Sequence, residues 1–132
     1  MTIDKDLLLA KAAEARKAAY APYSGFRVGA ALLCEDGRIF LGCNVENAAY
    51  SPTLCAERVA LGAAVAAGAR RFAALCVLGG HTDTPEACTP CGVCRQVLSE
   101  LCDGAMPVIF MTDAGITECR LGELLPYGFK LS

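Results

Sequence analysis

"FRVGAALLCEDGRIFLGCN", residues 26–44, consists of two β-favouring runs on either side of "EDGR". Within that break, Asp36-Gly37 supplies the positive φ that a tight hairpin turn needs. The stretch therefore predicts two antiparallel strands joined by a short turn. The segments that follow alternate between helix and strand patterns, which predicts a sheet covered by helices. Because the hairpin strands are antiparallel, we expect the sheet to be mixed.

The segments around the hairpin alternate between helical and strand patterns. A first helix is expected from about Lys5 to Tyr20, with Asp4 as its N-cap and Pro22 ending it. A second helix follows the loop "VENAAYSP" and runs to Gly68, a suitable C′ residue. The remaining expected elements are a central strand at 72–80, a helix at 91–102, and strands at 106–112 and 116–120.

This order predicts an α/β fold with three α/β/α layers around a mixed sheet of about five strands. The length of 132 residues fits a single domain spanning 1–132. Nothing in the chain indicates a linker, a repeat or a low-complexity segment.

Composition narrows the choice of partners. The net charge of −2 is spread over interspersed signs, with no basic stripe, so we expect no nucleic-acid partner. Mean hydropathy is +0.41, but no run approaches the roughly 18 apolar residues of a membrane span. A small domain with such an apolar composition suggests an oligomer.

The N-terminal segment lacks the features of a signal peptide, which predicts a cytoplasmic location.

Nine cysteines need an explanation. Their odd number and the missing signal peptide argue against a disulfide framework. Five of them lie in or beside apolar segments, where a thiol behaves as a small apolar side chain. These five are Cys34, Cys43, Cys76, Cys102 and Cys119.

Cys88, Cys91 and Cys94 form a C-x-x-C-x-x-C run. An iron–sulfur cluster would need a fourth cysteine a few residues later, where position 98 is leucine. Zinc would need only Cys91 and Cys94 at a helix start, together with a third ligand from elsewhere. Cys55, at the start of the preceding helix, is the best candidate for that ligand.

Glu57 suggests which kind of zinc site this is. A structural site closes with a fourth protein ligand, a position that Cys88 could take, whereas a catalytic site leaves it to water. A carboxylate beside that water can act as a proton shuttle. The alternative for Glu57 is a solvent-facing side chain stabilised by the helix dipole. Together with the cysteines, Glu57 favours the catalytic site.

Cys55-Ala56-Glu57 and "PCGVC" at residues 90–94 resemble the zinc deaminase signature. The stretches "YAPYSGFRVGAAL", "GCNVENAAYSPTLCAERVAL", "TPCGVCRQ" and "ELLPYGF" resemble the small cytidine deaminases over nearly the whole chain. Within that family the chain is similar to the short, three-cysteine, homotetrameric type.

The resemblance implies zinc-dependent hydrolysis of cytidine and deoxycytidine to uridine and deoxyuridine with release of ammonia, a reaction of pyrimidine salvage. It implies one Zn²⁺ per chain, held by Cys55, Cys91 and Cys94. Zinc would activate a water for attack on C4 of the base. Glu57 would take the proton of that water and deliver it to N3, and would then help to protonate the departing amine.

The same resemblance implies the substrate contacts. Asn44 and Glu46 would hydrogen-bond the ribose, Phe26 would pack against the base, and Ala56 would offer it backbone groups. Tyr50 and Phe129 would complete the sites of neighbouring subunits in the homotetramer.

Three thiolates leave a zinc centre with net negative charge, which makes its water less acidic. Arg58 and Arg95, each beside a site residue, could draw charge from the sulfurs through charge-assisted hydrogen bonds. The alternative is an ordinary surface arginine at each position. Two other functions remain open at this point: deamination of a related aminopyrimidine such as blasticidin S, and a non-catalytic structural zinc module that uses Cys88.

Overall fold

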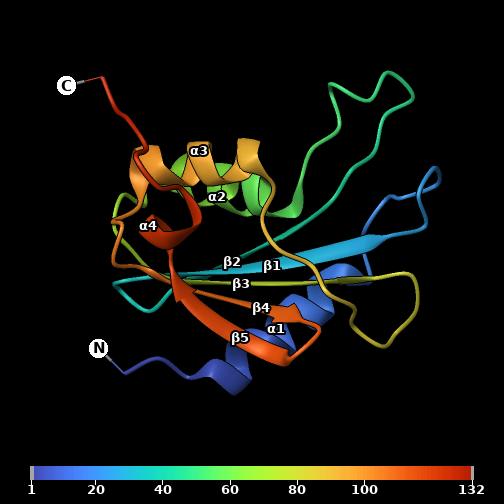
Figure 1. Cartoon of the computed structure of the whole chain (residues 1–132), viewed down its shortest axis with the longest axis horizontal. Helices are drawn as coiled ribbons and strands as arrows, with labels where there is room; N and C mark the ends of the chain where they lie inside the picture. Colours follow the sequence, from blue (N-terminus) through green and yellow to red (C-terminus); the bar gives the residue numbers. More distant parts are fainter. Residues whose placement is uncertain (1, 132) are drawn as a thin grey trace.

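The computed structural model describes residues 2–131. A five-stranded sheet in the order β2-β1-β3-β4-β5 lies between two helical layers (Figure 1). This arrangement confirms the predicted three-layer α/β/α fold with a mixed sheet.

The hairpin forms as predicted. β1 (Arg27–Cys34) pairs antiparallel with β2 (Ile39–Cys43). Gly37 in the turn has a φ of +94°, a conformation that glycine adopts without a steric penalty.

β3 (Phe72–Gly80) is the middle strand, and its residues are almost all buried. It pairs antiparallel with β1 and parallel with β4 (Pro107–Thr112). β5 (Gly115–Arg120) completes the sheet antiparallel to β4. The parallel pair and the hairpin together make the sheet mixed.

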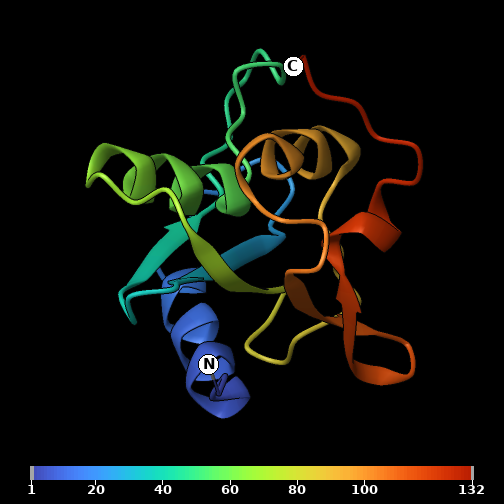
Figure 2. The ribbon, with the colours of Figure 1, turned by 90° about the vertical axis from the view of Figure 1, so that its left-hand side faces the viewer.

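Helices cover both faces of the sheet (Figure 2). α1 (Lys5–Arg16) packs on one face, where Leu8 and Ala12 belong to the same buried cluster as Ala31 and Cys76. The other face carries α2 (Ala56–Ala66) and α3 (Gly92–Leu101) over a second buried cluster that includes Cys34 and Cys102. Within residues 2–131 all nine cysteines are free thiols.

The first helix is shorter than predicted. Asp4 does cap it, because the Leu7 amide donates to Asp4 Oδ1 at 3.0 Å. The helix ends at Arg16 rather than near Tyr20. Tyr20 instead bridges to Val45, and its amide donates to Asn44 O at 3.0 Å. The chain must leave the helix before Tyr20 to make this pairing, so Pro22 is not what ends it.

The second helix ends as predicted, with Gly68 at the C′ position and a φ of +92°. Ala69 N donates to Ala64 O at 2.9 Å and Gly68 N donates to Val65 O at 3.0 Å. These two bonds form a Schellman motif that satisfies the last carbonyl groups of the helix.

A glycine fixes the start of α2 against the sheet. A Cβ at Gly42 would lie 2.2 Å from Ala56 O, closer than any real side chain allows. The first turn of α2 therefore rests directly on β2, and the side chains at the helix start are held in place.

One short element was not predicted: α4 (Leu121–Leu124), in which Leu121 is buried. None of the helices among the described residues is long and apolar enough to cross a bilayer.

Candidate functional site

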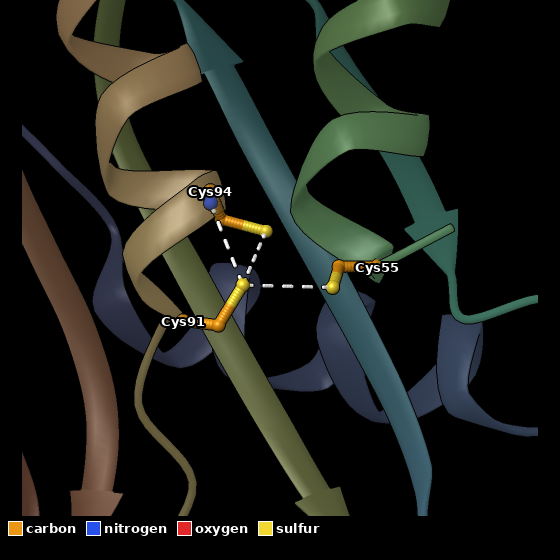
Figure 3. Close-up of side chains that lie close together, drawn as sticks. All are labelled: Cys55, Cys91 and Cys94. Carbon is orange, nitrogen blue, oxygen red and sulfur yellow. Dashed lines mark hydrogen bonds between the residues drawn. The ribbon is translucent and has the colours of Figure 1, made fainter. Parts of the chain in front are cut away.

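Two helix N-termini bring three cysteines together (Figure 3). Cys55 is the N-cap residue of α2, and Cys91 is the N-cap residue of α3. Cys94 lies in the first turn of α3 and is fully buried. The Sγ atoms of Cys55 and Cys91 are 3.7 Å apart, and those of Cys91 and Cys94 are 3.4 Å apart.

These distances fit one tetrahedral metal ion. Zinc–thiolate bonds of about 2.3 Å place neighbouring sulfurs about 3.8 Å apart. The three Sγ atoms all lie within 4.8 Å of one another. Soft thiolate ligands in this number suit zinc, and the positive ends of two helix dipoles stabilise the negative sulfurs.

The surroundings favour a thiolate at Cys55. A hydrogen bond from the Cys94 thiol, and a weaker one from the Arg58 guanidinium, lower the pKa of Cys55 to about 5 despite its partial burial. Arg58 Nη2 lies 3.6 Å from Cys55 Sγ and also donates to Thr53 O at 3.0 Å. Cys55 is thus prepared as a metal ligand at neutral pH.

Cys88 does not join the other three cysteines. Among the described residues, the group able to hold one metal ion contains only Cys55, Cys91 and Cys94. The side chain of Cys88 lies over Gly79, and burial raises the pKa of its thiol to about 12. The geometry therefore favours neither the iron–sulfur cluster nor the closed structural zinc site that would use Cys88.

A cavity of about 200 Å³ opens beside the three cysteines. Cys55 and Cys91 line it, as does Glu57 from the first turn of α2. The other residues that line it come from β1, the loops before and after the hairpin, the start of α2 and the loop before α3: Ser24, Phe26, Val28, Asn44, Glu46, Thr53, Leu54, Ala56, Cys88 and Thr89.

Glu57 is a buried carboxylate that lines the same cavity as Cys55 and Cys91. It is 4% exposed. Burial raises the pKa of Glu57 to about 7, and the negative charge of Cys55 acts in the same direction. A carboxyl group in this state can both accept and donate a proton near neutral pH.

Asn44 lines the cavity, and its side-chain amide is hydrogen-bonded to the backbone at the start of β1. Its Oδ1 accepts from Val28 N at 2.8 Å, and its Nδ2 donates to Phe26 O at 2.9 Å. One N–H and one oxygen lone pair of the amide remain available to a ligand. The side chain is 8% exposed, so its orientation is well fixed.

Glu46 is held by a loop residue that the sequence analysis did not single out, Ser24. The Ser24 hydroxyl donates to Glu46 Oε2, while the amides of Tyr23 and Ser24 donate to Oε1 at 2.9 and 3.1 Å. These bonds, the Ser24 hydroxyl first, lower the pKa of Glu46. Ser24 Oγ also accepts from the backbone N of Phe26 at 2.9 Å, so one serine links the Glu46 carboxylate to the backbone of Phe26.

The structure does not bring Tyr50 or Phe129 into this cavity. Tyr50 is 76% exposed and has a φ of 60°. Phe129 is 68% exposed and lines a separate hollow beside α4.

The two arginines behave differently. Arg58 reaches the sulfur of Cys55, and its Nε is buried with no hydrogen-bond partner among the described residues. Arg95 donates to Pro90 O at 2.7 Å and to Leu124 O at 3.0 Å. Arg95 therefore braces the loop that carries Cys91 instead of contacting a sulfur.

Sequence reasoning missed Ser24 and Gly79. A Cβ at Gly79 would lie 2.7 Å from Phe26 Cε1 and 2.8 Å from Cys88 Sγ. Two residues that line the cavity therefore pack on a glycine of the central strand. The serine stands within the motif "YAPYSGF", but a motif does not reveal which atoms it joins.

Comparison with known proteins gives one matching family, described as the "Cytidine and deoxycytidylate deaminase zinc-binding region", over residues 2–112. A curated relative from Sporosarcina psychrophila, named cytidine deaminase, is 51% identical over 129 residues, which is 97% of this chain and 93% of the relative. The cytidine deaminase of Mycobacterium tuberculosis is 43% identical over 98% of this chain and 92% of its own.

Solved structures agree with these relatives. The crystal structure of cytidine deaminase from Burkholderia pseudomallei has a TM-score of 0.87 at 46% identity, covering 96% of this chain and 100% of that one. The corresponding enzyme from Mycobacterium tuberculosis has a TM-score of 0.84 at 42% identity, covering 98% and 100%.

Proposed function

The chain belongs to the zinc-dependent cytidine and deoxycytidylate deaminase family, and from this membership we propose that it converts cytidine and deoxycytidine to uridine and deoxyuridine with release of ammonia. The observation that carries the proposal is the group of three sulfurs within 4.8 Å of one another, with the buried carboxylate of Glu57 lining the same cavity.

Cys55, Cys91 and Cys94 would hold the metal ion at the edge of the cavity, which Cys55 and Cys91 line. When bound there, zinc supplies a water acidic enough to act as a nucleophile at neutral pH. Arg58 shares the negative charge of Cys55 through its Nη2, which offsets part of the charge that three thiolates bring to the centre.

Glu57 moves the protons. Its carboxylate lines the cavity beside Cys55 and Cys91, within reach of a nucleophilic water and of a base placed there. It takes the proton of the water, delivers it to N3 of the base and then helps to protonate the departing amine. C4 of an aromatic pyrimidine is a poor electrophile. Protonation of N3 makes C4 more electrophilic and so eases attack by the nucleophile.

The nucleoside would lie along the other wall of the cavity. Phe26 packs against the base and Ala56 offers it backbone groups, while Asn44 and Glu46 bind the ribose hydroxyls. Glu46 accepts three hydrogen bonds from Tyr23 and Ser24; because a carboxylate accepts about four, about one acceptor position remains for a ribose hydroxyl.

Further subunits would complete the site in a homotetramer. Tyr50 and Phe129 are exposed and lie outside the cavity, which supports their use by a neighbouring chain. A left-handed backbone at a bulky residue such as Tyr50 is uncommon, and a subunit contact would give it a stabilising partner. Exposed apolar side chains, among them Tyr20, Tyr23, Leu54 and Tyr127, supply surface for such contacts.

The cytoplasm is the compartment that fits this site, because a set of three thiolate ligands needs reduced cysteines. The role there would be the salvage of pyrimidine nucleosides.

An ultraviolet assay of the zinc-loaded protein tests the proposal. We expect loss of cytidine and deoxycytidine absorbance, with cytosine and blasticidin S turned over at least about 100-fold less efficiently, because the ribose contacts would be lost or altered. Turnover of blasticidin S alone would favour the related aminopyrimidine activity. No turnover of any of the four would reject the deaminase.

A further inference from the structure

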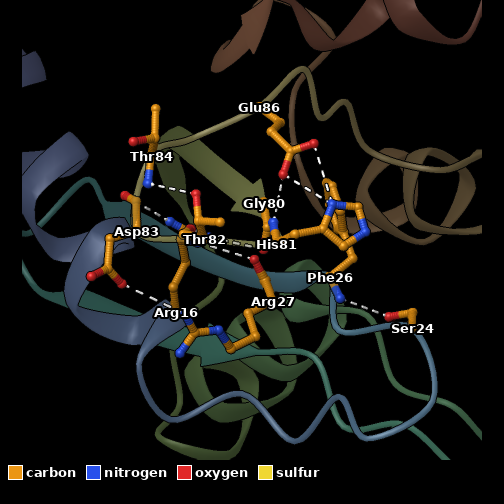
Figure 4. Close-up of polar contacts among 10 residues, drawn as sticks. All are labelled: Arg16, Ser24, Phe26, Arg27, Gly80, His81, Thr82, Asp83, Thr84 and Glu86. Atoms are coloured by element: carbon orange, nitrogen blue, oxygen red, sulfur yellow. Dashed lines mark hydrogen bonds and ion pairs between the residues drawn. The ribbon is translucent and has the colours of Figure 1, made fainter.

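The ring of Phe26, which lines the cavity, packs against the ring of His81, which does not (Figure 4). The two ring centroids are 5.1 Å apart and the ring planes meet at 82°. This edge-to-face arrangement is favourable for aromatic rings. His81 therefore lies behind the side chain that forms one wall of the cavity.

The imidazole of His81 is held by Glu86. The backbone amide of His81 donates to Glu86 Oε2 at 2.6 Å, and its Nδ1 lies 3.0 Å from the same oxygen. A carboxylate only accepts, so Nδ1 carries the hydrogen in this contact. The Glu86 amide donates to Gly79 O at 2.8 Å, which closes the intervening loop back onto the end of β3.

A buried arginine fixes the backbone next to both rings. Arg16 is 5% exposed and reaches from α1 to the paired ends of β1 and β3. Its Nε donates to Arg27 O at 3.0 Å and its Nη2 to Gly80 O at 3.0 Å. Arg27 follows Phe26 and Gly80 precedes His81 in the chain, so Arg16 sets the spacing of the two rings.

On the sheet side, Phe26 packs against Gly79, where an added Cβ would lie 2.7 Å from Phe26 Cε1. No side chain on that strand position restrains the ring from sliding or tilting. The His81 ring, packed edge-to-face with Phe26, supplies a contact that the glycine does not.

We propose that His81 is a positioning residue for substrate binding: with Glu86 and Arg16 holding it, its ring sets the pose of Phe26 against the nucleoside base. The inference rests on the proposed function of the cavity. His81 touches neither the metal-binding sulfurs nor the cavity, so it acts through Phe26 and affects binding more than the chemical step.

Two substitutions separate the ring contact from the hydrogen bond. His81→Gln keeps a side-chain donor for Glu86 and removes the ring, whereas His81→Phe keeps a ring and removes the donor. We expect His81→Gln to raise the KM for cytidine about two- to tenfold, the range that an aromatic pair contributes, with kcat within twofold of the parent. His81→Phe should raise KM less than His81→Gln does, because a ring remains beside Phe26 and the backbone amide of residue 81 still donates to Glu86; an equal rise in the two variants would contradict a role for the ring. Thr84→Ala, in the same loop, is the matched control and should change neither constant.

A double-mutant cycle with Phe26 tests the route of the effect. In a Phe26→Leu background, His81→Gln should change KM by less than twofold, because the ring that it positions is gone. An unchanged KM in His81→Gln, or the same rise in both backgrounds, would overturn the inference. Activity of the parent protein toward cytidine is measured first, so failure of the proposed function is distinguished from failure of this one.

Discussion

Arg58 donates a hydrogen bond from Nη2 to the sulfur of Cys55 across 3.6 Å, while its Nε is buried without a partner among the described residues. The arginine therefore lies beside the sulfur of a proposed metal ligand, although its Nε has no hydrogen-bond partner among the described residues. That arrangement is costly for a side chain with only a structural role, and it supports a part for Arg58 in tuning the charge of the zinc centre.

Removing Arg58 should weaken the chemistry without removing the metal. We expect Arg58→Ala to lower kcat by about ten- to 100-fold, the usual effect of losing a partner of a metal ligand, with one zinc per chain retained. Kinetics and metal analysis on the same preparation check this. Arg71→Ala, at an exposed arginine, is the control. An unchanged kcat in the fully zinc-loaded variant would sink this role for Arg58.

Replacing a proposed zinc ligand should lower the zinc content of the protein, whereas replacing Cys88 should not. Cys91→Ser should lose most of the zinc, because the site is left with two sulfurs. Cys88→Ser should keep one zinc per chain, since Cys88 is not among the three sulfurs that lie together. Metal analysis of both purified variants is the measurement. Loss of zinc in Cys88→Ser would point to a four-cysteine structural site.

A methyl group at Gly79 should disturb substrate binding. Gly79→Ala places a Cβ 2.7 Å from Phe26 Cε1 and 2.8 Å from Cys88 Sγ, so both side chains must shift, and the cavity that they line would change shape. We expect KM for cytidine to rise about tenfold or more, as sub-ångström misplacement of a binding wall commonly causes. Gly62→Ala, where a Cβ meets nothing within 4 Å, is the matched control. Equal KM values for the two variants would contradict the packing described above.

Ser24 should matter for both binding and acid sensitivity. Its hydroxyl is the main cause of the lowered pKa of Glu46. A lowered folded-state pKa gives stability that is present above the unfolded value of about 4.3 and is lost as the pH falls through the folded value. Ser24→Ala should therefore raise KM for cytidine at pH 7 and lower Tm there, and the Tm difference from the parent should shrink below about pH 4.

Thermal unfolding of parent and Ser24→Ala across the pH range checks the second half of that expectation. Ser99→Ala serves as the control, because the Ser99 hydroxyl donates to Gln96 O at 2.7 Å, within its own helix and away from Glu46. A Tm difference that stays constant from pH 7 to about pH 3 would mean that Glu46 is not the group involved.

Much of the fold could be predicted because its signals are local. The turn at Gly37, the cap at Asp4 and the helix end at Gly68 each depend on residues within a few positions. The end of α1 could not be predicted in the same way. It is decided by the pairing of Tyr20 with Val45, a contact between distant parts of the sequence.

In the candidate site, too, local patterns could be predicted and contacts between distant residues could not. The grouping of Cys55, Cys91 and Cys94 could be predicted because the chemistry of metal ligands restricts both residue type and spacing. The place of Glu57 beside them could be predicted because it lies two positions after Cys55 at the same helix start. Ser24, Gly79 and His81 could not, because each acts through a neighbour that the fold brings to it. Cys88 shows the opposite case: its spacing fits a ligand, but the chain turns its side chain over Gly79.

The most direct test of the central claim is the rate of cytidine deamination by zinc-loaded parent protein and zinc-loaded Glu57→Gln. The amide has nearly the same shape as the carboxylate but cannot carry a proton. We predict that the parent converts cytidine to uridine and that the variant, with the same zinc content, is slower by about 10²- to 10⁴-fold. A variant as active as the parent would contradict the role of Glu57 as the proton carrier, and an inactive zinc-loaded parent would contradict the deaminase itself.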